Sequence, residues 1–140
     1  MDTPTPAHVK AHATGRWAET IFRALSTRIA KRWQFVSFRG KKKGDSRGVV
    51  DVVAIRRCMS APSKRILKSG DLFDIVLVQI KGGSARDPTE SDLVRLREVA
   101  KRYHAHSVVK FHWRNGRDSR FSVLGRDGKW RPCEGTEIFG

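Results

Sequence analysis

The sequence has few cysteines, few acidic residues and no long hydrophobic run. Its two cysteines, Cys58 and Cys133, could form one bridge but are too few for a disulfide framework or a structural zinc site. No apolar stretch is long enough to span a bilayer, and the polar residues 1–6 lack the cationic region of a signal peptide. We therefore expect a cytoplasmic protein that does not enter a membrane.

The shortage of acidic residues leaves the chain strongly basic. Lysine and arginine together number 29 against 14 aspartates and glutamates, so the formal net charge is +15. Such an excess destabilises the compact state by self-repulsion and is usually explained by a polyanionic partner. Attraction to a membrane surface is the competing explanation, but neither terminus shows a Lys-rich amphipathic helix. The charge therefore predicts a nucleic-acid partner.

The length and the hydrophobic pattern predict one domain that contains both helices and strands. A chain of 140 residues is able to bury roughly two-thirds of its unfolded surface. We expect residues 1–6 to be a mobile tail and residues 7–140 to form a single domain. The pattern gives a helix, three strands, a helix and two strands. This order predicts an α/β (α+β) fold whose central mixed sheet is flanked by helices. The expected helices cover residues 7–33 and about 89–103, and the expected strands cover residues 34–38, 49–55, 72–81, 108–113 and 120–124.

The stretch 71–81 predicts a buried strand that ends in two polar residues. Because side chains alternate along a strand, Gln79 and Lys81 share the face of Leu77. Unpaired polar groups in a core cost on the order of a few kcal/mol each. We therefore expect Gln79 and Lys81 to have partners.

Asp51 interrupts the strand predicted for residues 49–55. A carboxylate in the middle of a central strand costs several kcal/mol unless it is paired, protonated or bound to a cation. A structural role, as a turn cap or the partner of a buried arginine, is the alternative. If the second and third strands are antiparallel neighbours, Asp51 and Gln79 converge. Glu19 lies beside the apolar stripe of the first helix, where by itself it is an ordinary surface carboxylate.

Two segments are rich in arginine and lysine. Five of the ten residues in the loop 39–48 are basic, and the hairpin turn 114–118 contains two arginines beside an Asn-Gly pair. A solvated charge run is the ordinary interpretation, but the overall charge favours loops that contact phosphates without reading bases. The predicted DNA-binding residues are Arg39, Lys41, Lys42, Lys43, Arg47, Arg114, Arg117 and Arg120.

The second predicted helix begins with a capping signal and ends with histidines. Thr89 suits the N-cap, and Asp92 lies at the third helical position, close to a capping box. His104 and His106 form an H-x-H pair that could ligate a metal. No third ligand lies nearby in the sequence, so we interpret them as ordinary turn histidines.

The order of elements and the polar residues together resemble the PD-(D/E)XK nuclease superfamily. The segment Gly48-Val-Val-Asp51 followed by Gln79-Ile-Lys81 is similar to the aspartate and the E-x-K motif of that family. Residues 90–103 and 108–114 are similar to the helix and strand of archaeal Holliday junction resolvase-like members. The resemblance covers roughly residues 15–125. It implies a restriction-endonuclease-like core, in which a helix, a three-strand meander, a second helix and a further strand follow one another.

The chain departs from the family pattern at two positions. Val50 replaces the proline before the aspartate, which is common in the superfamily. Gln79 replaces the acidic residue of E-x-K, a form similar to that of Mrr-type restriction enzymes and some RecB-type nucleases. A neutral amide removes one negative charge, so it should weaken divalent binding and argues against a two-metal site.

The resemblance implies a Mg²⁺- or Mn²⁺-dependent DNA endonuclease with Glu19, Asp51, Gln79 and Lys81 as its catalytic residues. Asp51, the Gln79 side-chain oxygen and the Ile80 backbone carbonyl would bind the metal, and Glu19 would complete the shell directly or through water. Lys81 would orient or deprotonate the attacking water and stabilise the phosphate. We expect DNA as partner, with a four-way junction among the candidate substrates, and a homodimer.

Two other functions remain open at this level. One is a nuclease fold that has lost catalysis and grips DNA through its basic surface, which Gln79 favours and Asp51 with Lys81 oppose. The other is an RNA-binding domain, which would need exposed aromatic residues for base stacking. Phe111, Trp113 and Phe121 alternate as core residues do, so we expect them to be buried.

Overall fold

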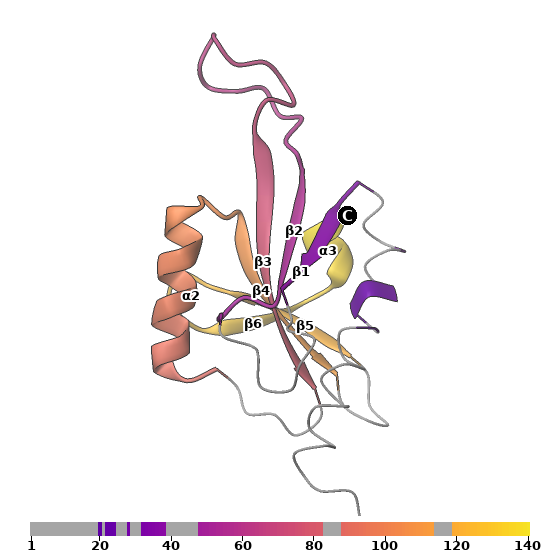
Figure 1. Ribbon diagram of the computed structural model, residues 1–140, viewed down its shortest axis with the longest axis vertical. Coiled ribbons are helices and arrows are strands. Elements are labelled where there is room, and N and C mark those ends of the chain that lie inside the picture. The colour runs from indigo at the N-terminus through magenta and orange to yellow at the C-terminus, as the bar shows by residue number, and fades with distance from the viewer. Residues whose placement is uncertain are drawn as a thin grey trace, which may run out of the picture.

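A computed structural model describes residues 20, 22–24, 28, 32–38, 48–82, 88–113 and 119–140. Residues 20, 22–24 and 28 are helical, and the rest of the described chain forms a twisted sheet with helices against it (Figure 1). The elements are β1 (Gln34–Ser37), β2 (Val52–Arg57), β3 (Phe73–Gly82), α2 (Glu90–Arg102), β4 (Ser107–Trp113), β5 (Arg120–Leu124), β6 (Trp130–Cys133) and α3 (Gly135–Phe139).

The six strands form one mixed sheet in the order β1-β2-β3-β4-β5-β6. Neighbouring strands are antiparallel except β3 and β4, which run parallel and are connected through α2. A parallel pair needs such a crossover, whereas antiparallel neighbours need only a turn. The predicted α+β class, the mixed sheet and the antiparallel pairing of the second and third strands are confirmed.

Helix α2 covers one face of the sheet. Its N-terminus carries the predicted capping box, in which the Asp92 N–H donates to Thr89 Oγ1 at 3.2 Å and the Thr89 N–H donates to Asp92 Oδ2 at 3.2 Å. Leu96 is completely buried in one apolar cluster with Leu77 and Val108. Burying a leucine stabilises a fold by about 1.5–3 kcal/mol. This packing fixes α2 over β3 and β4, beside the strand end that carries the polar residues.

The opposite face is filled with aromatic side chains. Phe22 is fully buried, with its ring centre 5.5 Å from that of Phe111, and Phe111 lies 5.0 Å from Phe121. The buried Trp33 indole N–H donates to the Phe139 carbonyl at 3.1 Å. The C-terminal helix α3 therefore closes this side of the core. Such aromatic contacts add about 0.5–1.5 kcal/mol each beyond their buried area.

A hairpin turn connects β5 and β6. The Gly125 N–H donates to the Lys129 carbonyl at 2.9 Å, and Gly128 has the positive φ of 79° that favours glycine. The Lys129 N–H also donates to Asp127 Oδ1 at 3.1 Å, and this bond lowers the pKa of the Asp127 carboxyl. Sequence pattern and turn chemistry agree here.

Several predictions fall on residues that the structure does not describe. The tail 1–6, Glu19, the basic loop 39–47, Arg114 and Arg117 all lie outside the described residues. In the part of the chain that is described, no helix is long and apolar enough to cross a membrane.

Candidate active site

Asp51 lies immediately before strand β2 and not in the middle of a strand, so the predicted position was wrong. Strand β2 begins at Val52, and Asp51 is the half-buried residue before it. Its N–H donates to the Val78 carbonyl at 3.0 Å, while its carbonyl accepts from the Phe38 N–H at 2.8 Å. Val52 pairs with Val78, so the Asp51 bond is displaced by one residue from the β2–β3 register. This displacement ends the regular ladder at the point where the carboxylate lies.

The Asp51 carboxylate is held by the backbone of β3. The Ile80 N–H donates to Asp51 Oδ2 at 2.7 Å in a partly buried position. This distance is typical of a hydrogen bond to a charged acceptor, which is about twice as strong as a neutral one. The carboxylate therefore replaces a ladder carbonyl for Ile80. The predicted convergence of Asp51 with the end of the third strand is confirmed.

Gln79 is the buried neighbour of this carboxylate, with only 5% of its surface exposed. Its Nε2 lies 3.5 Å from the Val49 carbonyl, a long and weak hydrogen bond. Its Oε1 is buried and has no hydrogen-bond partner among the residues that the structure describes. An unsatisfied buried acceptor costs about 1–3 kcal/mol. Of the partners predicted for this side chain, the described residues thus supply one for Nε2 and none for Oε1.

Lys81 follows two residues after Gln79 and is half-buried. Because alternate residues of a strand share a face, both side chains lie on the α2 side of the sheet together with Leu77. In the parallel register Lys81 is opposite His112 of β4. The structure therefore brings Asp51, Gln79 and Lys81 to one end of β3.

Lys110 belongs to the same region and was missed from the sequence. It is opposite Gln79 in the β3–β4 register and is 7% exposed. Its Nζ lies 4.9 Å from the centre of the Trp130 ring, a cation–π contact. Lysine is almost never this deeply buried without partners. The alternation of β4 already indicates that Lys110 shares the buried face of Val108. Only the strand register shows that Lys110 lies opposite Gln79.

The oxygen atoms of this cluster suit a hard cation better than zinc. Asp51 offers a carboxylate and Gln79 an amide oxygen, and Mg²⁺ prefers such ligands while keeping several waters. No group of three or more His, Cys, Asp or Glu side chains comes together within the described residues. Within the described residues the cluster therefore offers a cation two side chains with oxygen atoms, those of Asp51 and Gln79.

Comparison with known proteins gave no match. No protein-family model, curated protein or solved structure matched this chain. The resemblance to PD-(D/E)XK nucleases therefore stays a prediction from the motifs, and the chemistry of the site is argued from its geometry.

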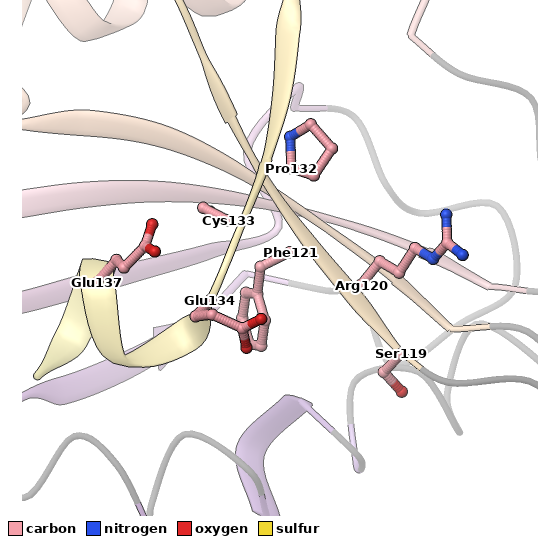
Figure 2. A pocket seen from close by; sticks show the side chains of 7 residues that line it. All are labelled: Ser119, Arg120, Phe121, Pro132, Cys133, Glu134 and Glu137. Carbon is pink, nitrogen blue, oxygen red and sulfur yellow. The ribbon is translucent and has the colours of Figure 1, made fainter.

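Apart from the Asp51 cluster, a hollow of about 360 Å³ lies between β5, β6 and α3 (Figure 2). Two glutamates line it, so it is acidic. Burial raises the pKa of the Cys133 thiol in its wall, and the carboxylates of Glu137 and Glu134 raise it further. Figure 2 shows the Arg120 guanidinium pointing away from both carboxylates. The carboxylates of Glu134 and Glu137 would repel a phosphate in this hollow, whereas Arg120, a predicted DNA-binding residue, would attract one. The remaining lining residues are Ser119, Phe121 and Pro132.

Neither cysteine is in a disulfide. Cys58 and Cys133 are both free thiols, so the bridge that the sequence allowed does not form.

Proposed function

We propose that the chain is a metal-dependent DNA endonuclease that hydrolyses phosphodiester bonds at the Asp51–Gln79–Lys81 cluster. One observation carries this proposal: the buried Gln79 Oε1 has no hydrogen-bond partner among the described residues, and it belongs to the residue beside the anchored Asp51 carboxylate. A cation bound by both side chains would supply that partner. It would also offset the cost of the buried acceptor.

The proposed cation is Mg²⁺ or Mn²⁺. Asp51, the Gln79 side-chain oxygen and the Ile80 backbone carbonyl would hold it, and Glu19 would complete the shell. When bound, such an ion neutralises charge on the scissile phosphate and lowers the pKa of a coordinated water. The bond from the Ile80 N–H fixes Asp51 before any ion arrives, so the ligand needs little reorganisation.

The lysines of the cluster supply the remaining chemistry. Lys81 would orient the attacking water and stabilise the negative charge that develops on the phosphate. Lys110, opposite Gln79 in the register, adds a second ammonium group on the same face of the sheet. Lys110 is 7% exposed and contacts the Trp130 ring, so it would act as a positioning residue that balances the charge of Asp51.

The proposed substrate is DNA, because a net charge of +15 attracts the phosphate backbone. We propose a homodimer as the active form, since two sites cut two strands of a duplex or a four-way junction. A junction-selective, Holliday junction resolvase-like activity is the finer proposal.

The second candidate is a DNA-binding module of the same fold without catalysis. It is favoured by the amide of Gln79 and by the lack of a three-ligand acidic cluster within the described residues. The RNA-binding alternative is weakened, because Phe111 is fully buried, Phe121 is 9% exposed and Trp113 is half-buried against the same aromatic cluster. The rings of Phe111 and Phe121 are not free to stack on bases from the sheet surface.

The test is cleavage of labelled linear, nicked and four-way-junction DNA with Mg²⁺ or Mn²⁺. Wild type is compared with Asp51→Asn and Lys81→Met, which keep the shape of each side chain. Exposed residues of the β5–β6 turn provide matched controls, Asp127→Asn and Lys129→Met. We expect cutting by wild type and both controls and a loss of at least about 100-fold in the two site variants.

A second readout separates the enzyme from the binding module. Titration calorimetry with Mn²⁺ should give heat with wild type and none with Asp51→Asn. If every protein bound DNA equally while none cut it and none bound Mn²⁺, the endonuclease proposal would be wrong and the binding module would replace it.

A further inference from the structure

We propose that the β2–β3 arm, residues 57–73, is a second DNA-contacting element that grips the duplex about one helical turn from the active site. The inference rests on the proposed function, because it takes DNA as the substrate. The arm continues the β2 and β3 strands and projects beyond the rest of the sheet (Figure 1).

The arm is an ordered structure. Its strands remain paired past the end of β2, since the Cys58 N–H donates to the Leu72 carbonyl at 2.8 Å and the Gly70 N–H donates to the Cys58 carbonyl at 2.9 Å. Arg57 Nη1 donates to the Gly70 carbonyl at 2.9 Å. At the tip, the Leu67 N–H donates to the Lys64 carbonyl at 3.1 Å. The tip is therefore held in a defined turn.

Large apolar side chains are exposed along this arm. Among the described residues eight large hydrophobic side chains are exposed, and four of them belong to the arm. Ile66, in the tip turn, is 85% exposed, the highest value of the eight. Single exposed apolar residues are ordinary, but a group on one projecting element marks an interaction surface. The other three are Met59, Leu72 and Phe73.

The same arm is basic, which selects the kind of partner. Arg57, Lys64, Arg65 and Lys68 oppose only Asp71 between residues 57 and 73. Asp71 Oδ2 also accepts the Lys68 backbone N–H at 2.7 Å, so this carboxylate is engaged in the turn. A surface that combines an apolar tip with flanking cations suits DNA, where lysine and arginine contact phosphates and an apolar wedge enters a groove.

A cleft at the root of the arm extends the basic surface. It has a volume of about 730 Å³ and is lined by the arginines Arg32, Arg56 and Arg57. Arg56 is fixed in place because its Nε donates to Asp74 at 3.1 Å and its guanidinium lies 4.4 Å from the Trp33 ring centre. The positive charge of these arginines, offset in part by Asp74, suits an anion such as a DNA phosphate.

The dimensions allow one duplex to reach both places. The six steps along β3 from Phe73 to Gln79 span about 20 Å at the rise of a strand, and the arm extends further in the same direction. One helical turn of DNA measures about 34 Å. A duplex whose scissile phosphate lies near Gln79 would therefore pass the arm roughly one turn away.

The test measures binding of a duplex of roughly two turns by fluorescence anisotropy, in Ca²⁺ so that cutting does not interfere. The arm variant carries Lys64→Ala, Arg65→Ala and Lys68→Ala in the full chain. Log K for DNA binding falls as log[salt] rises, and the loss of three phosphate contacts should make this slope less steep by about 2.7. Binding should weaken about 10- to 100-fold near 0.15 M salt. Ile66→Ser should weaken binding several-fold at an unchanged slope, because an apolar contact releases no counterion.

The matched control removes the same charge from α2. It carries Arg95→Ala, Lys101→Ala and Arg102→Ala, which are exposed on the helix surface. Screening limits long-range effects to about 8 Å at this salt, so we expect a loss below about threefold. Circular dichroism checks that both variants fold.

Each result decides between clear alternatives. Suppose that wild type binds and cuts DNA. If the arm variant then kept wild-type affinity and slope, or lost no more affinity than the helix control, the arm would have no role in DNA binding. If wild type neither bound nor cut any DNA, the proposed function itself would fail. If arm variants bound DNA normally but changed from dimer to monomer in sedimentation, the arm would be a contact for a second copy, and our inference would be wrong.

Discussion

Replacing Asp51 separates what this residue does for the fold from what it does for the reaction. Its Oδ2 accepts the Ile80 N–H at 2.7 Å, and Ile80 is 7% exposed. In Asp51→Ala this N–H loses its acceptor and is left where water hardly reaches. In Asp51→Asn a neutral side-chain oxygen is still present at the same place, so the hydrogen bond persists in weakened form.

The expected losses in stability follow from the strength of that bond. A hydrogen bond to a charged acceptor contributes about 1.5–3 kcal/mol, and a neutral one roughly half as much. We expect Asp51→Ala to lower the free energy of unfolding by about 2–3 kcal/mol and Asp51→Asn by about 1 kcal/mol. Both variants remove the same negative charge from a chain of net charge +15, so their difference isolates the hydrogen bond.

Urea unfolding followed by circular dichroism measures these losses. With a slope near 2 kcal/mol/M, the midpoint should fall by about 1–1.5 M for Asp51→Ala and about 0.5 M for Asp51→Asn. Mg²⁺ at tenfold its dissociation constant should raise wild-type stability by about 1.4 kcal/mol and leave both variants unchanged. Equal stability of the two variants would refute the role of the Ile80 bond. Stabilisation of Asp51→Asn by Mg²⁺ would refute Asp51 as a metal ligand.

Three further predictions concern single sites. Gln79→Glu should destabilise the metal-free protein by about 2 kcal/mol, because it buries a charge. Mg²⁺ should reverse this loss and bind the variant with a dissociation constant about tenfold lower than that of wild type. Urea unfolding with and without Mg²⁺ measures both effects. Cys133, in a Cys58→Ser background, should react with iodoacetamide only at higher pH than an ordinary thiol, because its folded pKa is raised, and Glu137→Gln should speed the reaction near pH 8 by favouring the thiolate. An unchanged rate would contradict the electrostatic cause. Thr89→Ala should lower stability by about 1 kcal/mol through loss of the capping box, without affecting cleavage.

Much of the fold could be predicted because local chemistry and packing agree. The capping residues Thr89 and Asp92, the apolar stripe of α2 and the alternation of the strands each indicate the observed structure without knowledge of the rest of the chain. The convergence of Asp51 with Gln79 needed one more assumption, antiparallel pairing of β2 and β3. That assumption was safe because the intervening segment has no helical pattern and consecutive strands usually pair.

The remaining features depend on contacts between distant segments. The one-residue displacement before β2 arises because the Asp51 side chain competes for the Ile80 N–H, and no local propensity encodes such a bond. The burial of Lys110 depends on the parallel register with β3 and on Trp130 of β6. The short helix α3 is stabilised by its contact with Trp33, which lies 106 residues earlier in the chain.

The polar cluster at the end of β3 is not explained by a contribution to the stability of the fold. An apolar side chain at Gln79 would remove an unsatisfied acceptor, so that replacement should be neutral or favourable for the fold. The bond from the Ile80 N–H offsets the burial of Asp51 in part, and Lys110 contacts the Trp130 ring. Sites at which a sequence departs from the rules of its own core are typically functional. Gln79 and Lys110 lie on one face of adjacent strands, and Asp51 precedes the neighbouring strand. Their oxygen and ammonium groups are those that a phosphodiester, its metal ion and its attacking water require.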